Sequence, residues 1–268
     1  MLKLNQEILA KITSAEAEKL TLEKDVYKIN ASGMSYRNLN KLLKTLDKAG
    51  AKKIEINNVY GQRYIGTGLR SNLAIDIFGT PGNDLAAFMD GQKITVHGNV
   101  QDCTGNTMNE GQIVIHGRAG DITGYGMRGG KIFVKDDIGY RSGIHMKEYM
   151  GKKPCIVVGG TAQDFLGEYM AGGVLLVVGL TLKSGEKHKA KFVGTGMHGG
   201  VIYISGEVTN LGKEVKIMDV NNNDLTIIKS LVKEYSSNFD IDASDVMERK
   251  YVKIVPVSHR PYGTVYAY

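Results

Sequence analysis

The chain has 268 residues with a formal net charge of +6 at pH 7, and 42% of its residues are hydrophobic. This composition allows a sizeable core and excludes a disordered chain, despite the 34 glycines. No stretch reaches the roughly 20 apolar residues of a membrane span. The segment MLKLNQEILAKITSAEAEK (1–19) lacks the apolar centre of a signal peptide, so the sequence favours a cytoplasmic protein with no membrane partner.

The charges and cysteines argue against further classes of protein. The basic residues are dispersed apart from KSGEKHKAK (183–191), which is typical of a solvated loop, and the chain has no tryptophan. Because nucleic-acid surfaces interleave basic and aromatic residues, this pattern argues against a nucleic-acid partner. Cys103 and Cys155 form no CxxC pair, which favours two small buried side chains over a disulfide framework or a thiolate zinc site.

Residues 1–60 are predicted to form an N-terminal arm and a β-α-β cap. VYKINASG (26–33) alternates like a strand, and KKIEINNV (52–59) predicts a second strand. Between them, Ser35 is a good N-cap for a helix that stops at Gly50. One face of this helix carries four leucines: Leu39, Leu42, Leu43 and Leu46.

A repeat of nearly constant length fills the central segment, residues 61–208. Its anchor is a methionine, replaced by leucine in the first unit: Leu69, Met89, Met108, Met127, Met146, Met170 and Met197. Most anchors are 19 or 20 residues apart, and the two longer gaps hold insertions at 147–155 and 181–190. An apolar run such as Ile113-Val-Ile follows the anchors, so a strand and a tight corner recur seven times.

Only glycine or alanine occupies the position three residues before each anchor. These residues are Gly66, Ala86, Gly105, Gly124, Gly143, Gly167 and Gly194. A corner explains the restriction, because either the backbone takes a positive φ or a Cβ would strike the next coil. We therefore expect Gly124→Val to damage the fold more than Arg128→Ala.

The length of the repeat leaves few architectures. Helical-hairpin repeats need more than about 30 residues and propeller blades about 40, and the chain lacks the leucine and asparagine pattern of leucine-rich repeats. A parallel β-helix fits, with one strand in each coil and the methionines and aliphatic residues as an inner ladder. Seven coils at a spacing of about 4.8 Å would form a column roughly 30 Å tall. The prediction is a mainly β, single-stranded solenoid.

Residues 209–268 are predicted to form a C-terminal helix and tail. Asp224 can cap a helix that runs to about Tyr235. Its apolar residues would be Leu225, Ile228, Leu231 and Val232. ASDVMER (243–249) predicts a short helix, and YVKIVPVSHRPYG (251–263) predicts a last strand followed by a tail.

One glycine-rich motif suggests nucleotide binding but lacks the necessary context. GYGMRGG (124–130) has the Gly-x-Gly-x-x-Gly spacing of a dinucleotide-binding loop. Such a loop needs a helix after it, whereas a β-branched and aromatic run follows at 131–135. The motif belongs to the repeat instead.

Two sets of side chains recur at equivalent places in the coils. His97 and His116 form one pair, and Asp102, Asp121 and Asp164 form another set. A metal ladder or a bound cation is one interpretation, and solvated histidines with corner aspartates that accept backbone hydrogen bonds are the other. Repetition favours structure, so the residues by themselves predict no catalytic, cofactor-binding or metal site.

Three stretches resemble the GXGXG domain that closes the C-terminus of the glutamate synthase large subunit. They are AGDITGYGMRGGKIFV (119–134), LGEYMAGGVLLVVG (166–179) and FVGTGMHGGVIYISG (192–206), and Glu168 to Gly173 is the most specific point of likeness. The β-α-β cap and the VPVSHRPYG tail resemble the stand-alone version found in prokaryotes, especially archaea. The same repeat occurs in one of the subunits of formylmethanofuran dehydrogenase, a tungsten or molybdenum enzyme, which is the more distant resemblance.

The resemblance implies a right-handed β-helix that supports a glutamine amidotransferase and a flavin synthase, which together make glutamate from glutamine and 2-oxoglutarate. The chain would be a non-catalytic scaffold with no cofactor of its own, and its partner subunits would carry FMN and iron-sulfur clusters. Self-association as a homo-oligomer stays open.

A free-standing solenoid hydrolase is the alternative from another functional class. It would use Asp102, Asp121, His97 and His116 as its candidate residues. In either case the insertions at 147–155 and 181–190 are expected to carry contacts, because loops that interrupt a repeat commonly do so.

Overall fold

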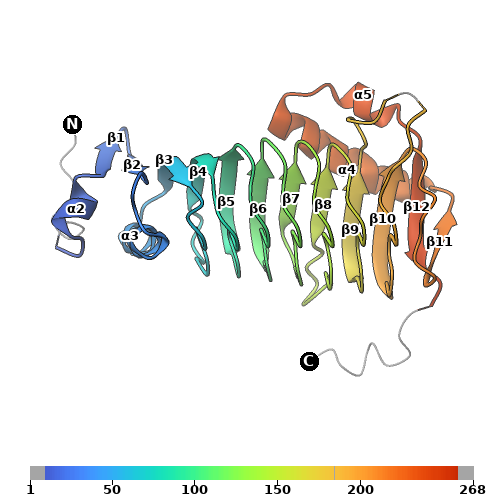
Figure 1. Ribbon diagram of the computed structural model, residues 1–268, viewed down its shortest axis with the longest axis horizontal. Helices are drawn as coiled ribbons and strands as arrows, with labels where there is room; N and C mark the ends of the chain where they lie inside the picture. The colour runs from blue at the N-terminus through green and yellow to red at the C-terminus, as the bar shows by residue number, and fades with distance from the viewer. Residues whose placement is uncertain (1–9, 184, 259–268) are drawn as a thin grey trace.

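The computed structural model describes residues 10–183 and 185–258, which are organised around one long sheet (Figure 1). Its twelve strands follow the order β1-β2-β3-β4-β5-β6-β7-β8-β9-β10-β12-β11. The strands are β1 (Leu20–Glu23), β2 (Val26–Asn30), β3 (Lys53–Tyr60), β4 (Ala74–Thr80), β5 (Asp90–His97), β6 (Glu110–Ile115), β7 (Lys131–Val134), β8 (Cys155–Val158), β9 (Ala171–Val177), β10 (Gly199–Ser205), β11 (Val215–Met218) and β12 (Tyr251–Pro256). The helices are α2 (Ser14–Ala17), α3 (Tyr36–Lys48), α4 (Asn222–Phe239) and α5 (Ala243–Met247).

Strands β4 to β10 form the predicted parallel β-helix, with one strand in each coil. Each strand pairs in parallel with the next, and six turns join these seven strands. The chain is a mainly β, right-handed solenoid, as parallel crossover connections favour. The predicted fold class is confirmed.

An apolar ladder fills the inside of the solenoid. The strand residues in register are Ile75, Ile94, Ile113, Ile132, Ile156, Leu175 and Ile202, all buried. The six anchor methionines are at most 1% exposed. Ile132 pairs directly with Ile156 and Leu175 with Ile202, so both insertions loop out without disturbing the strand register.

The N-terminal cap extends the same sheet. β2, α3 and β3 form the predicted β-α-β unit, and β3 pairs with β4 across the predicted boundary at residue 60. The Ser35 hydroxyl caps α3 by accepting a hydrogen bond from Asn38 N–H at 3.2 Å, and the four leucines of α3 are buried. No sequence pattern predicted β1, which pairs antiparallel with β2.

The C-terminal segment closes the other end of the column and covers one of its faces (Figure 1). β12 pairs antiparallel with β10, and β11 pairs with β12. α4 packs on the outer face of the sheet, where Ile228, Leu231 and Val232 join a second apolar core with Val114 and Phe133.

The elements of the C-terminal segment follow the prediction apart from one apolar residue. Leu225 was assigned to the apolar face wrongly, because its side chain is 37% exposed. α5 and β12 confirm the predicted short helix and last strand, and the predicted tail from residue 259 lies outside the described residues. Within the described ranges, the helices lack the length and apolar character that crossing a membrane requires.

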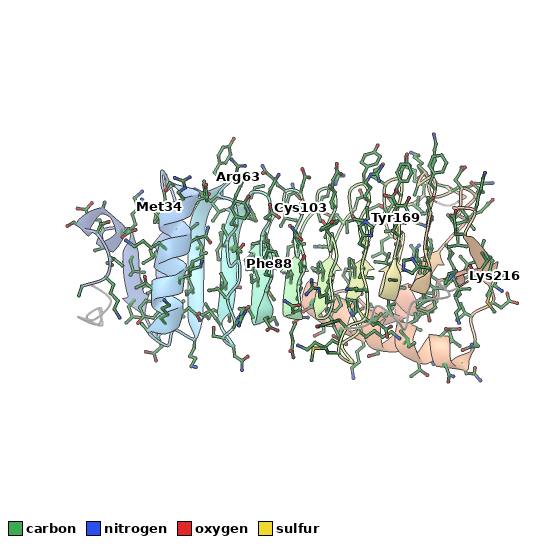
Figure 2. The ribbon with its side chains drawn as sticks, turned by 90° about the horizontal axis from the view of Figure 1, so that it is seen from below. Met34, Arg63, Phe88, Cys103, Tyr169 and Lys216 are labelled. Atoms are coloured by element: carbon green, nitrogen blue, oxygen red, sulfur yellow. The ribbon has the colours of Figure 1, made fainter. Side chains whose placement is uncertain are left out.

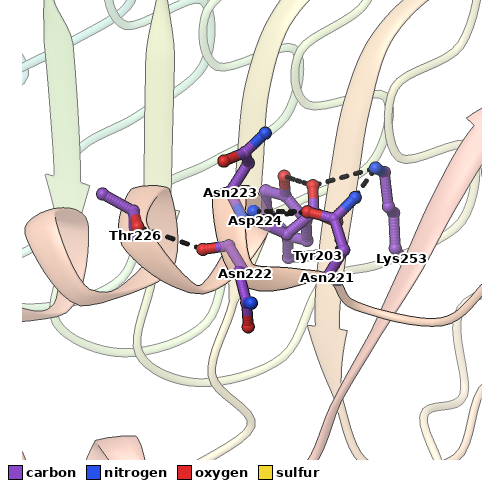
Figure 3. Close-up of polar contacts among 7 residues, drawn as sticks. All are labelled: Tyr203, Asn221, Asn222, Asn223, Asp224, Thr226 and Lys253. Atoms are coloured by element: carbon purple, nitrogen blue, oxygen red, sulfur yellow. Dashed lines mark hydrogen bonds and ion pairs between the residues drawn. The ribbon is translucent and has the colours of Figure 1, made fainter.

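A buried polar network fixes the start of α4 (Figure 3). The N-cap is Asn221 rather than Asp224, which closes a capping box by accepting a hydrogen bond from Asn221 N–H at 2.9 Å. The Asp224 carboxylate also accepts from the Tyr203 hydroxyl at 2.7 Å and lies 2.8 Å from the Lys253 ammonium. Burial by itself would raise the pKa of Asp224, but these hydrogen bonds outweigh it and lower the pKa. The network therefore ties α4 to β10 and β12.

Candidate interaction surface

The side of the column away from α4 is built from turns, and we call it the turn wall. It comprises residues 64–68, 84–88, 103–107, 122–126, 141–145, 165–169 and 192–196, and Figure 2 shows Cys103 and Tyr169 on this side. In every coil the residues five, three and one before the anchor have positive φ. One coil, for example, has φ of 60° at Cys103, 70° at Gly105 and 53° at Thr107.

Backbone hydrogen bonds join the coils along the turn wall. Cys103 N–H donates to the Asp121 carbonyl of the following coil at 2.9 Å, whereas Gly105 N–H donates to the Leu85 carbonyl of the preceding coil at 2.9 Å. The same alternation recurs in the later coils. The turn wall thus satisfies its backbone polar groups much as a sheet does.

The corner glycines lie on the inner side of the turn wall. Gly66, Gly105, Gly124, Gly143, Gly167 and Gly194 have φ between 68° and 74°, and Ala86 has φ of 59° at the equivalent place. A Cβ on Gly124 would lie 2.4 Å from Ile156 Cδ1, and one on Gly105 would lie 2.6 Å from Ile132 Cδ1. At both glycines, a side chain is therefore disfavoured by the positive φ and also by close contact with another coil.

The outer positions of the turn wall carry large side chains. The residues with positive φ there include Tyr64, Phe88, Arg141, His145, Phe165, Tyr169 and Phe192. Tyr64, Phe88, Tyr169 and Phe192 are between 40% and 54% exposed. They form an exposed aromatic surface along the column.

Aromatic rings of the last coils contact one another. The ring of His145 stacks on that of Tyr169 with centroids 5.5 Å apart, and Tyr125 meets His145 edge-on at 5.8 Å. Phe165 and Phe192 stack at 5.0 Å. These contacts span coils, so the rings are held in a fixed arrangement rather than scattered on the surface.

The Glu-Tyr-Met run belongs to this surface. The buried Glu168 carboxylate pairs with the Arg141 guanidinium, which lies 4.6 Å from the centroid of the Phe165 ring. Tyr169 points outward and Met170 inward. The run therefore places an ion pair, an exposed ring and a core residue in consecutive positions.

These side chains occupy backbone conformations that glycine would adopt at lower cost. A left-handed conformation costs a non-glycine residue roughly 1–2 kcal/mol. Glycine does occupy the position one before the anchor at Gly68, Gly126 and Gly196, whereas Phe88 and Tyr169 stand at the same place in other coils. Exposed aromatic residues kept at such a cost indicate a contact surface.

The repeated aspartates connect neighbouring coils. Asp102 Oδ1 accepts from Asp121 N–H at 2.9 Å, and Asp121 Oδ1 accepts from Tyr140 N–H at 2.9 Å. Asp164 Oδ1 likewise accepts from Lys191 N–H at 2.8 Å. The aspartates thus accept backbone hydrogen bonds, as one of the two interpretations of the sequence predicted. The donors belong to the next coil, however, and are not local.

The repeated histidines lie on the outer face of the sheet. His97 and His116 stack at 5.2 Å within a longer row of rings that runs from Phe78 to Phe239. Asp76 Oδ1 lies 3.4 Å from His97 Nε2. Burial, helped by nearby positive charges, lowers the pKa of His116. In the part of the chain that the structure describes, three or more His, Cys, Asp or Glu side chains are nowhere placed to share a metal ion.

The two insertions pack against the column. In the first, Tyr149 and Lys152 form an antiparallel bridge, and the Lys152 ammonium lies 2.6 Å from Glu110 two coils away. In the second, His188 is 5% exposed and its Nε2 lies 2.7 Å from the Ser205 carbonyl oxygen. The expectation of a solvated loop at 183–191 was therefore wrong for His188, because its ring is part of the packed structure.

Both cysteines are free thiols. Burial raises the pKa of Cys155 to about 11. Burial, followed by the charges of nearby aspartates, also raises the pKa of Cys103, which is only partly buried. Neither environment activates a thiolate.

The GXGXG motif family matches residues 38–257. The chain belongs to the GXGXG family. An uncharacterized protein of Methanocaldococcus jannaschii is 48% identical over 248 residues, which cover 89% of this chain and 95% of that protein. A chain of the formyltransferase/hydrolase complex of Methylorubrum extorquens, solved with methylofuran, has a similar fold, with a TM-score of 0.54 at 19% identity over 74% of this chain and 72% of that one.

The sequence predicted the inward-facing glycines of this GXGXG repeat but not the exposed aromatic residues of the turn wall. The glycine three residues before the anchor is evident in the sequence because that position hardly varies. The signal for the outer surface was the recurrence of aromatic residues at odd offsets before the anchor, as at Tyr64, Phe88, Phe165 and Tyr169. Only the φ values show that these residues share the conformation of the motif glycines.

Proposed function

We propose that this GXGXG chain is a non-catalytic scaffold subunit of an oxidoreductase complex, and specifically of a glutamate-synthase-like complex. The observation that carries the proposal is the turn wall, on which exposed aromatic side chains are kept in strained backbone conformations. Such a surface suits partner subunits that must bind in register along a rigid column.

The partners in this proposal are a glutamine amidotransferase and a flavin synthase subunit that carries FMN and iron-sulfur clusters. The chain itself would bind no cofactor. Support comes from the Glu168–Gly173 run, which resembles the glutamate synthase domain, and from membership of the GXGXG family. The similar solved chain also belongs to a multi-subunit complex.

A second candidate is a role like that of the formylmethanofuran dehydrogenase subunit that contains the same repeat. The observation that favours it is the fold shared with a chain of a formyltransferase/hydrolase complex. The scaffold role would be the same, and only the catalytic partners would differ.

A free-standing hydrolase has less support. The Asp102 and Asp121 carboxylates already accept backbone hydrogen bonds, and His97 and His116 stack in the row of rings. Within the described residues, no hydrogen bond, ion pair or ring contact joins either aspartate to either histidine. The four candidates therefore do not form one site.

The test is affinity capture of tagged chain from its own cells, with co-purifying proteins identified by mass spectrometry. The test variant is Phe88→Gly with Tyr169→Gly, which removes two exposed rings. Relief of about 1 kcal/mol of left-handed strain per residue should offset the lost ring packing, so the fold should survive. The matched control is Tyr60→Ala with Phe78→Ala, because these exposed rings lie outside the turn wall.

Recovery of an amidotransferase and a flavin synthase subunit with wild type and control, but not with the test variant, is the expected result. Recovery of formyltransferase or hydrolase subunits, or of a tungsten or molybdenum enzyme, would favour the second candidate. A wild-type chain that emerges alone would refute the scaffold proposal.

A further inference from the structure

The exposed face of α3 carries a stripe of basic residues. They are Arg37, Lys41, Lys44 and Lys48, and all are exposed. Their spacing places them on one side of the helix, away from the buried leucines. The basic residues outside 183–191 were predicted to be dispersed. This was wrong for α3, because the helix places four of them in one stripe.

A groove runs between this stripe and the first turn of the solenoid. Its volume is about 490 Å³, and it is lined by Tyr36, Arg37, Asn40, Lys41, Lys44, Thr45, Lys48, Tyr64 and Thr67. The rings of Tyr36 and Tyr64 lie 5.8 Å apart at one part of the groove. The lining therefore combines apolar rings with four cations and contains no carboxylate.

The two sides of the groove are tied together. The Asn40 amide donates to the carbonyl of Tyr36 within α3 at 2.8 Å and to the carbonyl of Arg63 in the turn at 2.9 Å. The Arg63 guanidinium lies 5.9 Å from the centroid of the Tyr36 ring. Figure 2 shows Arg63 beside α3, the blue helix. The groove is thus preformed rather than dependent on movement of α3.

The cations of the stripe lack acidic partners in the described part of the chain, unlike many lysines elsewhere. Lys131 pairs with Glu234 at 2.6 Å, for example, and Lys152 with Glu110. The acidic residue of α3, Asp47, instead accepts a hydrogen bond from the Ser71 hydroxyl. Four uncompensated cations along a preformed groove favour an anionic occupant.

We propose that this basic groove binds an extended acidic segment of a partner polypeptide, an inference that rests on the scaffold role proposed above. Lys48 lies eleven positions after Arg37, so the stripe is roughly 16 Å long at a helical rise of about 1.5 Å per residue. That length matches about five residues of extended chain. The apolar rings would contact side-chain carbons of the segment while the cations bind its carboxylates.

The ring geometry favours a polypeptide over a single-stranded nucleic acid. Bases bind by stacking on exposed ring faces. Here the Tyr36 and Tyr64 rings are tilted at 53° to each other, and the Arg37 and Arg63 guanidinium groups both lie within 6 Å of the Tyr36 centroid, at 5.7 and 5.9 Å. The Tyr36 ring therefore already has two guanidinium groups close to it, which leaves less room for a stacked base.

The test measures binding of a fluorescein-labelled peptide of about ten glutamates to the full chain by fluorescence anisotropy at several salt concentrations. The test variant is Arg37→Glu with Lys41→Glu. Arg37 lies in the first turn of α3, where an acidic side chain agrees with the helix dipole, and Lys41 is exposed in the next turn, so α3 should remain folded. The matched control is Lys229→Glu with Lys233→Glu, which has the same spacing on the exposed side of α4 and the same change in net charge. Circular dichroism checks the fold of both variants.

We expect the peptide to bind wild type and control alike. It should bind the test variant about tenfold more weakly, because the two substitutions make the charge of the groove more negative by four elementary charges. Equal weakening in both variants, absence of peptide binding, or tighter binding of an oligothymidylate of similar length would overturn the proposal. If the chain binds the peptide selectively but captures no partner subunits, the groove proposal is supported and the scaffold role is refuted. If the chain captures partner subunits but does not bind the peptide, the scaffold role is supported and the groove proposal is refuted.

Discussion

Replacing Gly124 by alanine should destabilise the solenoid much more than replacing Gly126, although the two glycines lie in the same turn. Both have positive φ, of 73° and 57° respectively. Each alanine would therefore incur the left-handed penalty of roughly 1–2 kcal/mol. The difference between the two substitutions comes from what the new methyl group meets.

At Gly126 the nearest atom to a new Cβ would be Thr107 Oγ1 at 3.8 Å, which is ordinary contact. At Gly124 the new Cβ would lie 2.4 Å from Cδ1 of Ile156, a fully buried residue of the inner ladder. Overpacking of this kind adds about 1–3 kcal/mol. We therefore expect losses of about 2–5 kcal/mol for Gly124→Ala and about 1–2 kcal/mol for Gly126→Ala.

Equilibrium unfolding in urea, followed by far-ultraviolet circular dichroism, measures both losses against wild type. Similar transition slopes in the three proteins would show that the midpoints report stability. Equal midpoint shifts for the two variants would refute the argument, because strain alone would then account for the glycine at both positions.

Three further predictions concern buried titratable groups. Cys155 should resist iodoacetamide at about pH 8 in the folded chain, because burial raises the pKa of its thiol to about 11; mass spectrometry should detect its modification only after unfolding, and rapid native modification would contradict its burial. Asp224→Ala should lower the free energy of unfolding by about 3 kcal/mol or more because it leaves the Lys253 charge unpaired, whereas Thr226→Ala on the exposed side of α4 should change it by about 0.5 kcal/mol or less; equal melting shifts would refute this. Burial lowers the pKa of His188, so protons bind the unfolded chain more readily and stability should fall as the pH drops below about 6.5. His188→Gln should flatten that part of the pH profile in urea titrations, and an unchanged profile would show that other groups cause it.

Most of the fold could be predicted from the sequence because the repeat has a nearly constant length. Met108 and Met127 recur at the interval of one coil, and Gly105 and Gly124 hold the corner three residues earlier. In a stacked solenoid, each residue lies above its equivalent in the preceding coil, so spacing along the chain becomes position in space. The inner ladder, the corner glycines and the cap around α3 followed from such local patterns.

Contacts between segments that are distant in the sequence are visible only in the tertiary structure. Tyr203 and Lys253, which contact the Asp224 carboxylate, lie on strands that are distant from α4 in the sequence, and only folding brings them to it. The outward rings of the turn wall and the basic groove beside α3 likewise arise from residues that only folding brings together. Local periodicity fixes a repeating backbone, whereas contacts between non-equivalent segments depend on the path of the chain in three dimensions.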